Sequence, residues 1–284
     1  MVFPPRYAFR DLGLTAGFAA ILLTGGATTE AAAQAKLEAH YRATLSGLPI
    51  GSGSWTVDLA DDRYTMAASG HASGVFRIFA SGSGGGAVTG SLHGGRAVPV
   101  SYASAVRTKH KTDEVKMALT GGAVKNLSIE PPFEPGPGHV PLTEAHKRGV
   151  LDPISAGVLP RAGGDTLGPE SCQRTVAVFD GRMRFDAALS FKRMERVRSE
   201  KGYEGPAIVC AIAYHPLGGH ETEKFAIKFL RENRDMEVWY VPIAGTRFLA
   251  VYRISIPTML GPATLYATRF VVTVKSARAT ARTQ

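Results

Sequence analysis

Several features that mark common protein classes are absent from this sequence. No serine has a glycine two residues away on both sides, so the nucleophile elbow of α/β-hydrolases is missing. The glycine-rich run at residues 81–86 is not followed by the Gly-Lys-Ser/Thr of a phosphate-binding loop. No repeat of about 20 to 50 residues indicates a propeller or a solenoid. The sequence therefore gives no sign of an α/β-hydrolase, a protein with a phosphate-binding loop, or a repeat fold.

Long apolar runs are also scarce, and the only one lies at the start of the chain. Arg6 and Arg10 precede an apolar stretch at residues 12–27, and Ala31-Ala32-Ala33 supplies a small-residue cleavage site. This order predicts a secretory signal peptide at residues 1–33, cleaved near Ala33, and hence a periplasmic protein. The alternative is an N-terminal membrane anchor, but polar residues and glycines interrupt the run. After cleavage we expect no transmembrane span, and no cysteine near the site suggests a lipoprotein.

The charge of the chain is basic, with 33 Lys and Arg against 24 Asp and Glu, a formal net charge of +9. An exported basic protein can meet anionic lipids, lipopolysaccharide or acidic polymers. The basic residues are spread along the chain, however, which favours simple solubility. Basicity without a recognition helix or a stacking motif, in an exported chain, argues against a nucleic-acid partner.

Only two cysteines occur, Cys172 and Cys210. Two cysteines in an exported chain most often pair, and this pair would contribute about 4 kcal/mol in the chain-entropy model. A reactive thiol is the alternative. Both cysteines fall on apolar strand faces without a basic helix N-terminus, which favours the disulfide.

The clearest local signal is a hairpin at residues 175–186. Asp180-Gly181 suits a two-residue turn of type I′, which would place Phe179 opposite Arg182 and Val178 opposite Met183. One face of this hairpin is then apolar and the other polar, as in a half-buried sheet.

Alternating apolar and polar residues also predict strands in most of the remaining chain. They lie at residues 37–45, 55–59, 64–68, 75–80, 97–107, 115–119, 123–129, 207–214, 225–229, 238–241, 249–256 and 264–274. Residues 81–86 read as a flexible connection, and the charged segment 191–203 as a strand extension or a loop. Roughly fifteen strands with few helices predict an all-β fold, a strongly curved antiparallel sheet or incomplete β-barrel.

The middle of the chain interrupts this pattern. The proline-rich run at 131–138 cannot join a ladder. Two short helices are expected at 143–148 and after Asp152-Pro153, where Asp152 is an N-cap and Pro153 the first helical residue. We therefore expect a single β-rich domain at 34–275, with halves at 34–130 and 171–275 joined by residues 131–160, and a basic tail at 276–284.

Several of these segments together resemble an exported bacterial family described as domain of unknown function 3108. The resemblance rests on residues 47–51, 141–155, the Phe179-Asp-Gly-Arg182 turn, 205–210 and 237–242, which span nearly the whole mature chain. It implies an envelope location and a β-rich fold similar to the open barrels that carry lipids or lipoproteins. It supplies no catalytic residues.

Candidate polar sites have simpler structural explanations. His215 and His220 with Glu221 and Glu223 could bind a metal, but histidines in a loop are more often surface residues, so we expect no metal and no cofactor. Asp152 beside Ser155 could suggest an acid and a nucleophile, yet helix capping explains it. The basic residues of 182–184 and 192–201 could bind an anionic headgroup, although a solvated outer face is the favoured interpretation.

The remaining positive feature is a set of aromatic side chains on faces expected to point inward. They form a tentative apolar binding face: Trp55, Tyr64, Phe185, Tyr214, Phe229, Trp239 and Tyr252. Such rings must be buried in a filled core or against a ligand. The leading hypothesis is a non-enzymatic periplasmic protein that binds lipid, lipoprotein or another apolar or amphipathic envelope component. The alternatives are an envelope scaffold that binds a protein or polysaccharide, and an enzyme with a site assembled from distant loops.

Overall fold

A computed structural model describes residues 34–73, 82–162 and 167–275, which belong to the compact unit Ala32–Gln284. Three predictions lie outside the described residues: the signal peptide at 1–33, the strand at 75–80 and the tail at 276–284. Within the described part, no helix is long and apolar enough to cross a membrane.

One sheet contains all the strands that the structure describes. They are β1 (Gln34–Leu45), β2 (Leu48–Leu59), β3 (Arg63–Ala72), β4 (Gly82–His93), β5 (Arg96–Thr108), β6 (Thr112–Thr120), β7 (Ala123–Glu130), β8 (Val158–Pro160), β9 (Arg174–Phe179), β10 (Arg184–Arg198), β11 (Lys201–Gly202), β12 (Glu204–Gly218), β13 (Glu237–Pro242), β14 (Phe248–Thr258) and β15 (Gly261–Lys275). The main path runs β7-β6-β5-β4-β3-β2-β1-β15-β14-β13-β12-β10-β9, with β8 beside β14 and β11 beside β15.

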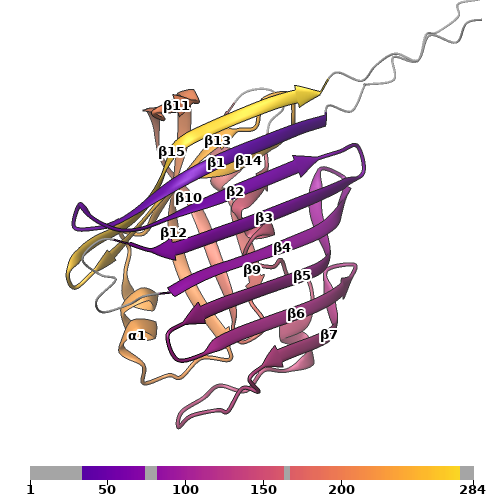
Figure 1. Cartoon of the computed structure of the whole chain (residues 1–284), viewed down its shortest axis with the longest axis vertical. Coiled ribbons are helices and arrows are strands. Elements are labelled where there is room, and N and C mark those ends of the chain that lie inside the picture. The colour runs from indigo at the N-terminus through magenta and orange to yellow at the C-terminus, as the bar shows by residue number, and fades with distance from the viewer. Residues whose placement is uncertain (1–33, 74–81, 163–166, 276–284) are drawn as a thin grey trace, which may run out of the picture. The chain divides into compact units, whose positions relative to one another are not determined.

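The predicted all-β, strongly curved antiparallel fold is confirmed, and the sheet is not closed into a barrel. Figure 1 shows β1 to β7 in front of β10 and β12 to β14, so the sheet faces itself. Every second residue of β1, from Ala35 to Tyr41, is buried. One face of the strand is therefore apolar and must be covered by another part of the sheet. One hydrophobic core holds buried residues of both walls.

The two ends of the sheet path, β7 and β9, do not pair with each other, but a connecting segment reaches both. We call residues 149–160 the inner segment. The backbone N–H of Val150 donates to the carbonyl of Gly122 in the β6–β7 turn at 3.0 Å. The next residue, Leu151, pairs with β9 by donating to Ala177 and accepting from Phe179. The inner segment thus holds the two sheet edges together.

Asp152 fixes the conformation of the inner segment. Its Oδ1 accepts hydrogen bonds from the backbone N–H groups of Ile154 and Ser155 at 2.9 and 3.0 Å. Ser155 in turn contacts the hydroxyl of Tyr64 on β3 at 2.8 Å, and all three polar side chains are buried. The predicted N-cap position needs a correction, because the turn is a 3₁₀ helix at Ser155–Gly157 whose N-cap is Ile154. Asp152 instead accepts hydrogen bonds from the backbone just before and at the start of that helix. The other predicted helix is also 3₁₀, at Glu144–Lys147.

The two cysteines form a disulfide. Cys172 ends a 3₁₀ helix at Pro169–Cys172, and Cys210 lies on β12, with 5.5 Å between their Cα atoms. Both side chains are fully buried. The bond therefore joins the segment before β9 to the inner face of β12, two strands away in the same part of the sheet.

The hairpin prediction needs a correction in its register. Phe179 lies opposite Arg184, not Arg182, so the turn has four residues instead of two. The Asp180 carboxylate causes this, because it accepts hydrogen bonds from the backbone N–H groups of Arg182 and Met183. A shift of two residues leaves each side chain on its predicted face.

This four-residue turn also touches the far end of the sheet path. Gly181 has a φ of +99°, and a Cβ added there would collide with Val115 of β6. Arg182 forms an ion pair with Asp113 of β6 at 3.2 Å. A glycine is thus required by both the backbone conformation and the close approach of the two walls.

Two predicted segments have a different structure. Residues 225–229 are not a strand but part of helix α1 (Phe225–Glu232), in which Phe225 and Phe229 stack with ring centroids 5.8 Å apart. Apolar residues four apart fit a helix as well as alternate residues fit a strand. Residues 82–86 of the glycine-rich run are not a flexible connection, because they belong to β4. The segment 191–203 is mainly a continuation of β10.

Asp152 gives a pH-dependent test of the inner segment. Burial raises the pKa of Asp152, against the opposing effect of the hydrogen bonds from Ser155 and Ile154. A raised pKa means that the contribution of Asp152 to stability is present in acid and declines as pH rises through the folded-state pKa. Asp152→Asn keeps the Oδ1 acceptor and removes the buried charge. Its stability relative to the wild type should therefore increase from pH 4 to pH 7.5 in urea unfolding.

The matched variant Asp152→Ala removes the acceptor as well. It should lower the free energy of unfolding by about 1 to 2 kcal/mol at pH 4 and by less at pH 7.5, where the buried charge of the wild type offsets part of the gain from the hydrogen bonds. An Asp152→Asn protein whose stability relative to the wild type is the same at both pH values would contradict the pH-dependent role.

Candidate functional site: an apolar cavity between the sheet walls

The inward side chains change size along β1 to β4, from large at one end of the strands to small at the other. One row across the four strands is large and fully buried: Leu37, Val57, Met66 and Val88. The next inward row is Ala39, Trp55, Ala68 and Gly86, and the row after that is Tyr41, Gly53, Gly70 and Gly84. The loss of side-chain volume leaves space on the inner face.

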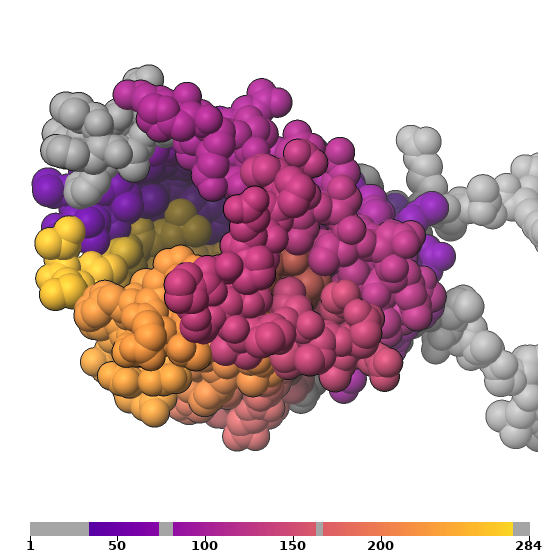
Figure 2. All heavy atoms as spheres, turned by 90° about the horizontal axis from the view of Figure 1, so that it is seen from below, coloured from indigo at the N-terminus to yellow at the C-terminus, as the bar shows by residue number. Residues whose placement is uncertain are grey.

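A cavity of about 500 Å³ occupies this space. β1, β2 and β3 form one wall, β14 and β15 another, and Pro153, Ile154 and Gly157 of the inner segment form a third. Figure 2 shows a hollow beside the indigo strands and the yellow strand β15. The volume lies within the range of about 300 to 1,000 Å³ that is typical of small-molecule sites.

The lining of the cavity is apolar. No Asp, Glu, Lys or Arg occurs among the described residues that line it. The serines and the histidine of the lining alternate with glycines on β2 and β3, and they pair on the outer face: Ser54 with Ser69 at 2.8 Å, and Ser52 with His71 at 3.0 Å. The cavity thus offers dispersion contacts and backbone groups, which suit an uncharged apolar group.

Tyr41 braces the cavity at the β1 wall. Its hydroxyl donates to the carbonyl of Val251 on β14 at 2.6 Å, across the intervening strand β15. Burial raises the pKa of Tyr41 well above its usual value of 10. This residue is therefore a neutral hydrogen-bond donor that links β1 to β14.

Of the seven aromatic residues in the predicted binding face, the structure brings Trp55 alone to the cavity wall. Its ring packs against Gly157 of the inner segment, where a Cβ would come within 3.0 Å of the indole. Tyr64 lies deeper, its ring covers Gly90, and its hydroxyl contacts Ser155.

The other five rings lie elsewhere. Phe185 and Tyr214 form a half-buried pair with centroids 5.3 Å apart. Tyr252 packs in a filled cluster, 5.9 Å from Phe270 and 6.3 Å from Tyr203. Phe229 belongs to α1, so its predicted position on an inward strand face is wrong.

Trp239 was expected to point inward, and this is also wrong. It alternates with Val238, which pairs with Cys210 on the inner face and with Ile254 of the cavity wall. Successive side chains of a strand point to opposite faces, so Trp239 lies on the outer face. It is nevertheless only 3% exposed.

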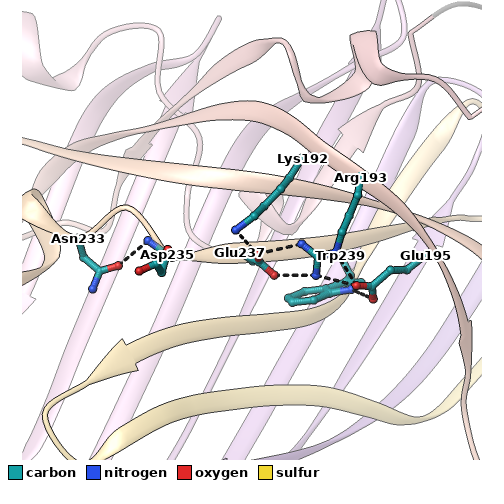
Figure 3. A network of polar contacts seen from close by, with 7 residues as sticks. All are labelled: Lys192, Arg193, Glu195, Asn233, Asp235, Glu237 and Trp239. Carbon is teal, nitrogen blue, oxygen red and sulfur yellow. Dashed lines mark hydrogen bonds and ion pairs between the residues drawn. The ribbon is translucent and has the colours of Figure 1, made fainter.

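Charged side chains bury this outer-face tryptophan. Figure 3 shows the network around it. The indole N–H donates to Glu195 at 2.6 Å, and the guanidinium of Arg253 lies 4.6 Å from the ring centroid. Arg193 joins the two carboxylates, since it donates to Glu195 at 2.6 Å and to both oxygens of Glu237 at 2.9 and 3.0 Å.

The basic residues considered for headgroup binding are matched by acids. Arg184 pairs with Asp186 at 2.7 Å, and Lys192 pairs with Glu237 at 2.5 Å. Further along β10, two arginines lie 3.6 Å from Glu204. These basic side chains of β10 therefore lie beside acidic side chains and do not form a patch of positive charge alone.

Among the described residues, no group of three or more His, Cys, Asp or Glu could hold a metal ion. His220 is buried, and burial is the main cause that lowers its pKa. Its neighbour in the sequence, Glu221, forms an isolated bridge with His139.

Comparison with known proteins identifies the family. The family model described as a protein of unknown function, DUF3108, matches residues 38–268. The chain belongs to this family. The resemblance inferred from the sequence is thus confirmed. The matched residues include every described residue that lines the cavity, from Tyr41 of β1 to Leu265 of β15.

Comparison with solved structures finds two distant matches. A β-barrel-like protein of the DUF1849 family from Brucella abortus has a TM-score of 0.42 and 10% identity, over 85% of this chain and 98% of that chain. A protein provisionally described as a lipoprotein from Parabacteroides distasonis has a TM-score of 0.32 and 8% identity, over 82% and 94% of the two chains. No curated protein matches the sequence significantly.

Sequence reasoning missed the glycines and alanines that create the cavity of this DUF3108 protein. Their signal was present as a period of two, in Gly51-x-Gly53, in Ala68-x-Gly70-x-Ala72 and in Gly82-x-Gly84-x-Gly86. Small residues at alternate positions of neighbouring strands share one face. That pattern indicates missing side-chain volume on the inner face.

Glu237 provides a test of the outer-face network. The hydrogen bond from Arg193 lowers the pKa of Glu237, burial opposes this, and Lys192 lowers it further. A lowered pKa contributes stability above the unfolded-state value of 4.5, which is lost as pH falls through the folded-state pKa. Glu237→Gln should reduce the free energy of unfolding by about 2 kcal/mol at pH 7 and by less at pH 3.5.

Denaturant unfolding at the two pH values measures this difference. Glu134→Gln, an exposed glutamate outside the network, is the control and should leave the stability unchanged at pH 7. An equal effect of Glu237→Gln at both pH values would show that the ion pairs do not cause the acid sensitivity.

Proposed function

We propose that this protein is exported to the periplasm and binds an apolar or amphipathic component of the cell envelope, such as a lipid or the acyl part of a lipoprotein, without catalysing a reaction. The observation that carries the proposal is the cavity of about 500 Å³ with an uncharged lining. An acyl chain is long, narrow and uncharged, so it matches both the volume and the chemistry of this space.

The position of the small residues supports a binding role. Three neighbouring strands place Gly53, Gly70 and Gly84 in one cross-strand row. Glycine is unfavourable within strands, and a void forfeits packing contacts. Glycines that lower strand stability and leave a void are expected where the empty space has a function, such as holding a ligand.

Export is supported by two independent features of the chain. The first is the Arg6, Arg10 and 12–27 pattern that precedes Ala33. The second is the fully buried disulfide, since such bonds persist in oxidising compartments.

Filling the cavity tests its role. Gly70→Val and Ala68→Leu place apolar volume on the inner face, and a Cβ at Gly70 meets only the carbonyl of Ser52, at 3.5 Å. Each should lower the affinity for a fluorescent fatty acid at least tenfold, because the probe and the new side chain compete for the same space. The free energy of unfolding should stay within about 1 kcal/mol of the wild type.

The matched control is Ala67→Leu, which adds the same volume to the exposed outer face of the same strand. It should bind the fluorescent fatty acid like the wild type. Mass spectrometry of solvent extracts from natively purified protein should detect a co-purified lipid. Protein that carries no lipid, and filled variants that bind the probe normally, would refute the proposal.

A further inference from the structure

Two hairpin tips next to the cavity expose large apolar side chains. Leu48 follows the β1–β2 turn and is 58% exposed, while Met259 and Leu260 form the β14–β15 turn and are 76% and 69% exposed. The tips are joined, because Ser46 donates through its backbone N–H to Pro262 at 2.9 Å and through its hydroxyl to the carbonyl of Leu260. Together they form one surface, which we call the paired tips.

The strands that lead to the paired tips are free of charge over a long distance. Residues 43–57 and residues 254–268 contain no Asp, Glu, Lys or Arg. A water-exposed hairpin usually carries charged or strongly polar residues at its tip. The absence of charge on two adjacent hairpins is what insertion into a lipid surface requires.

The charge-free region ends at a defined row. Arg42 of β1, Tyr266 of β15 and Arg253 of β14 lie directly opposite one another across the three strands. Arg42 donates to the hydroxyl of Tyr266 at 3.3 Å, and its ion pair with Glu200, at 3.5 Å, is largely exposed. Arginine and tyrosine are the residues that favour the headgroup layer of a membrane, where arginine meets anionic phosphates.

The spacing fits insertion of the tips. The Arg253–Tyr266 pair is five register steps from the Thr258–Gly261 pair at the turn, which is about 17 Å along the strands. Interfacial elements bury about 5 to 10 Å below the headgroups. With the tips about 10 Å deep, the row lies about 7 Å from the headgroups, which is within a Debye length of the charged surface.

We propose that the paired tips dock this protein on an anionic lipid surface, with Leu48, Met259 and Leu260 in the acyl boundary and the Arg42–Tyr266–Arg253 row at the headgroups. The row nearest to these arginines on the tip side is Ala43, Leu265 and Ile254, and all three line the cavity. Docking therefore places the cavity beside the lipid. The docking itself does not depend on the proposed function; only the inference that docking serves lipid entry into the cavity rests on it.

Vesicle co-sedimentation of the oxidised protein tests the docking. The protein should bind vesicles of phosphatidylglycerol and phosphatidylethanolamine at low salt. The double variant Met259→Asp with Leu260→Asp should bind about tenfold less, and Asp suits a turn, so the fold should be kept. Arg42→Gln should weaken binding to these vesicles about fivefold. The same change should leave binding to phosphatidylcholine vesicles unchanged.

Two controls separate this surface from other features. The double variant Val100→Asp with Val106→Asp introduces the same two charges at exposed apolar residues of β5, each 49% exposed, and should bind vesicles like the wild type. Gly70→Val fills the cavity and should also keep vesicle binding, whereas the tip variant should keep fatty-acid binding. Docking is overturned if the wild type does not sediment with anionic vesicles, or if the tip variant sediments as well as the wild type. An equal loss in the Val100→Asp, Val106→Asp protein would likewise overturn it, since that result would assign the effect to net charge.

Discussion

The structure depends on how the two ends of a long sheet are held. Each end of a sheet has unpaired backbone N–H and C=O groups, and β7 and β9 do not form a ladder with each other. The inner segment bonds near both ends, because Val150 donates to Gly122 in the β6–β7 turn and Leu151 exchanges two hydrogen bonds with the edge of β9. A buried aspartate fixes this segment through two backbone N–H groups. With both edges held, the sheet must face itself, and its inner surface becomes either core or cavity.

The size of the inward residues decides between those two outcomes. The same strands carry Leu37, Val57 and Met66 at one end and glycines or alanines at the other, with a single ladder register throughout β2 and β3. Apolar patterning alone would bury both ends equally. The large end packs fully, while the small end leaves the cavity, and Ile154 of the inner segment lines it between the walls. Core and candidate site are thus two ends of one set of strands.

The sequence was sufficient to predict the fold class, nearly all described strands, and the pairing of Cys172 with Cys210, since alternation and cysteine count are local signals. It did not specify which face of β13 is inside. Trp239 is apolar by composition, but Arg253 and Glu195 bury it on the outer face through contacts from other strands. The four-residue spacing of Phe225 and Phe229 fits one face of a strand and one face of a helix equally well. In the structure the two rings stack on helix α1. Long-range pairing, which no local pattern encodes, accounts for these errors.

An open apolar cavity and exposed apolar tips both weaken a fold in water, so the strands that carry them need other sources of stability. The wall from β10 to β14 has two. The disulfide restrains the unfolded chain by about 4 kcal/mol in the entropic model. The Arg193, Glu195 and Glu237 network joins β10 to β13 on the outer face, where it does not occupy the cavity. Stability is thus provided on the outer face and at the end of the wall. The inner face and the tips are left free for apolar contacts.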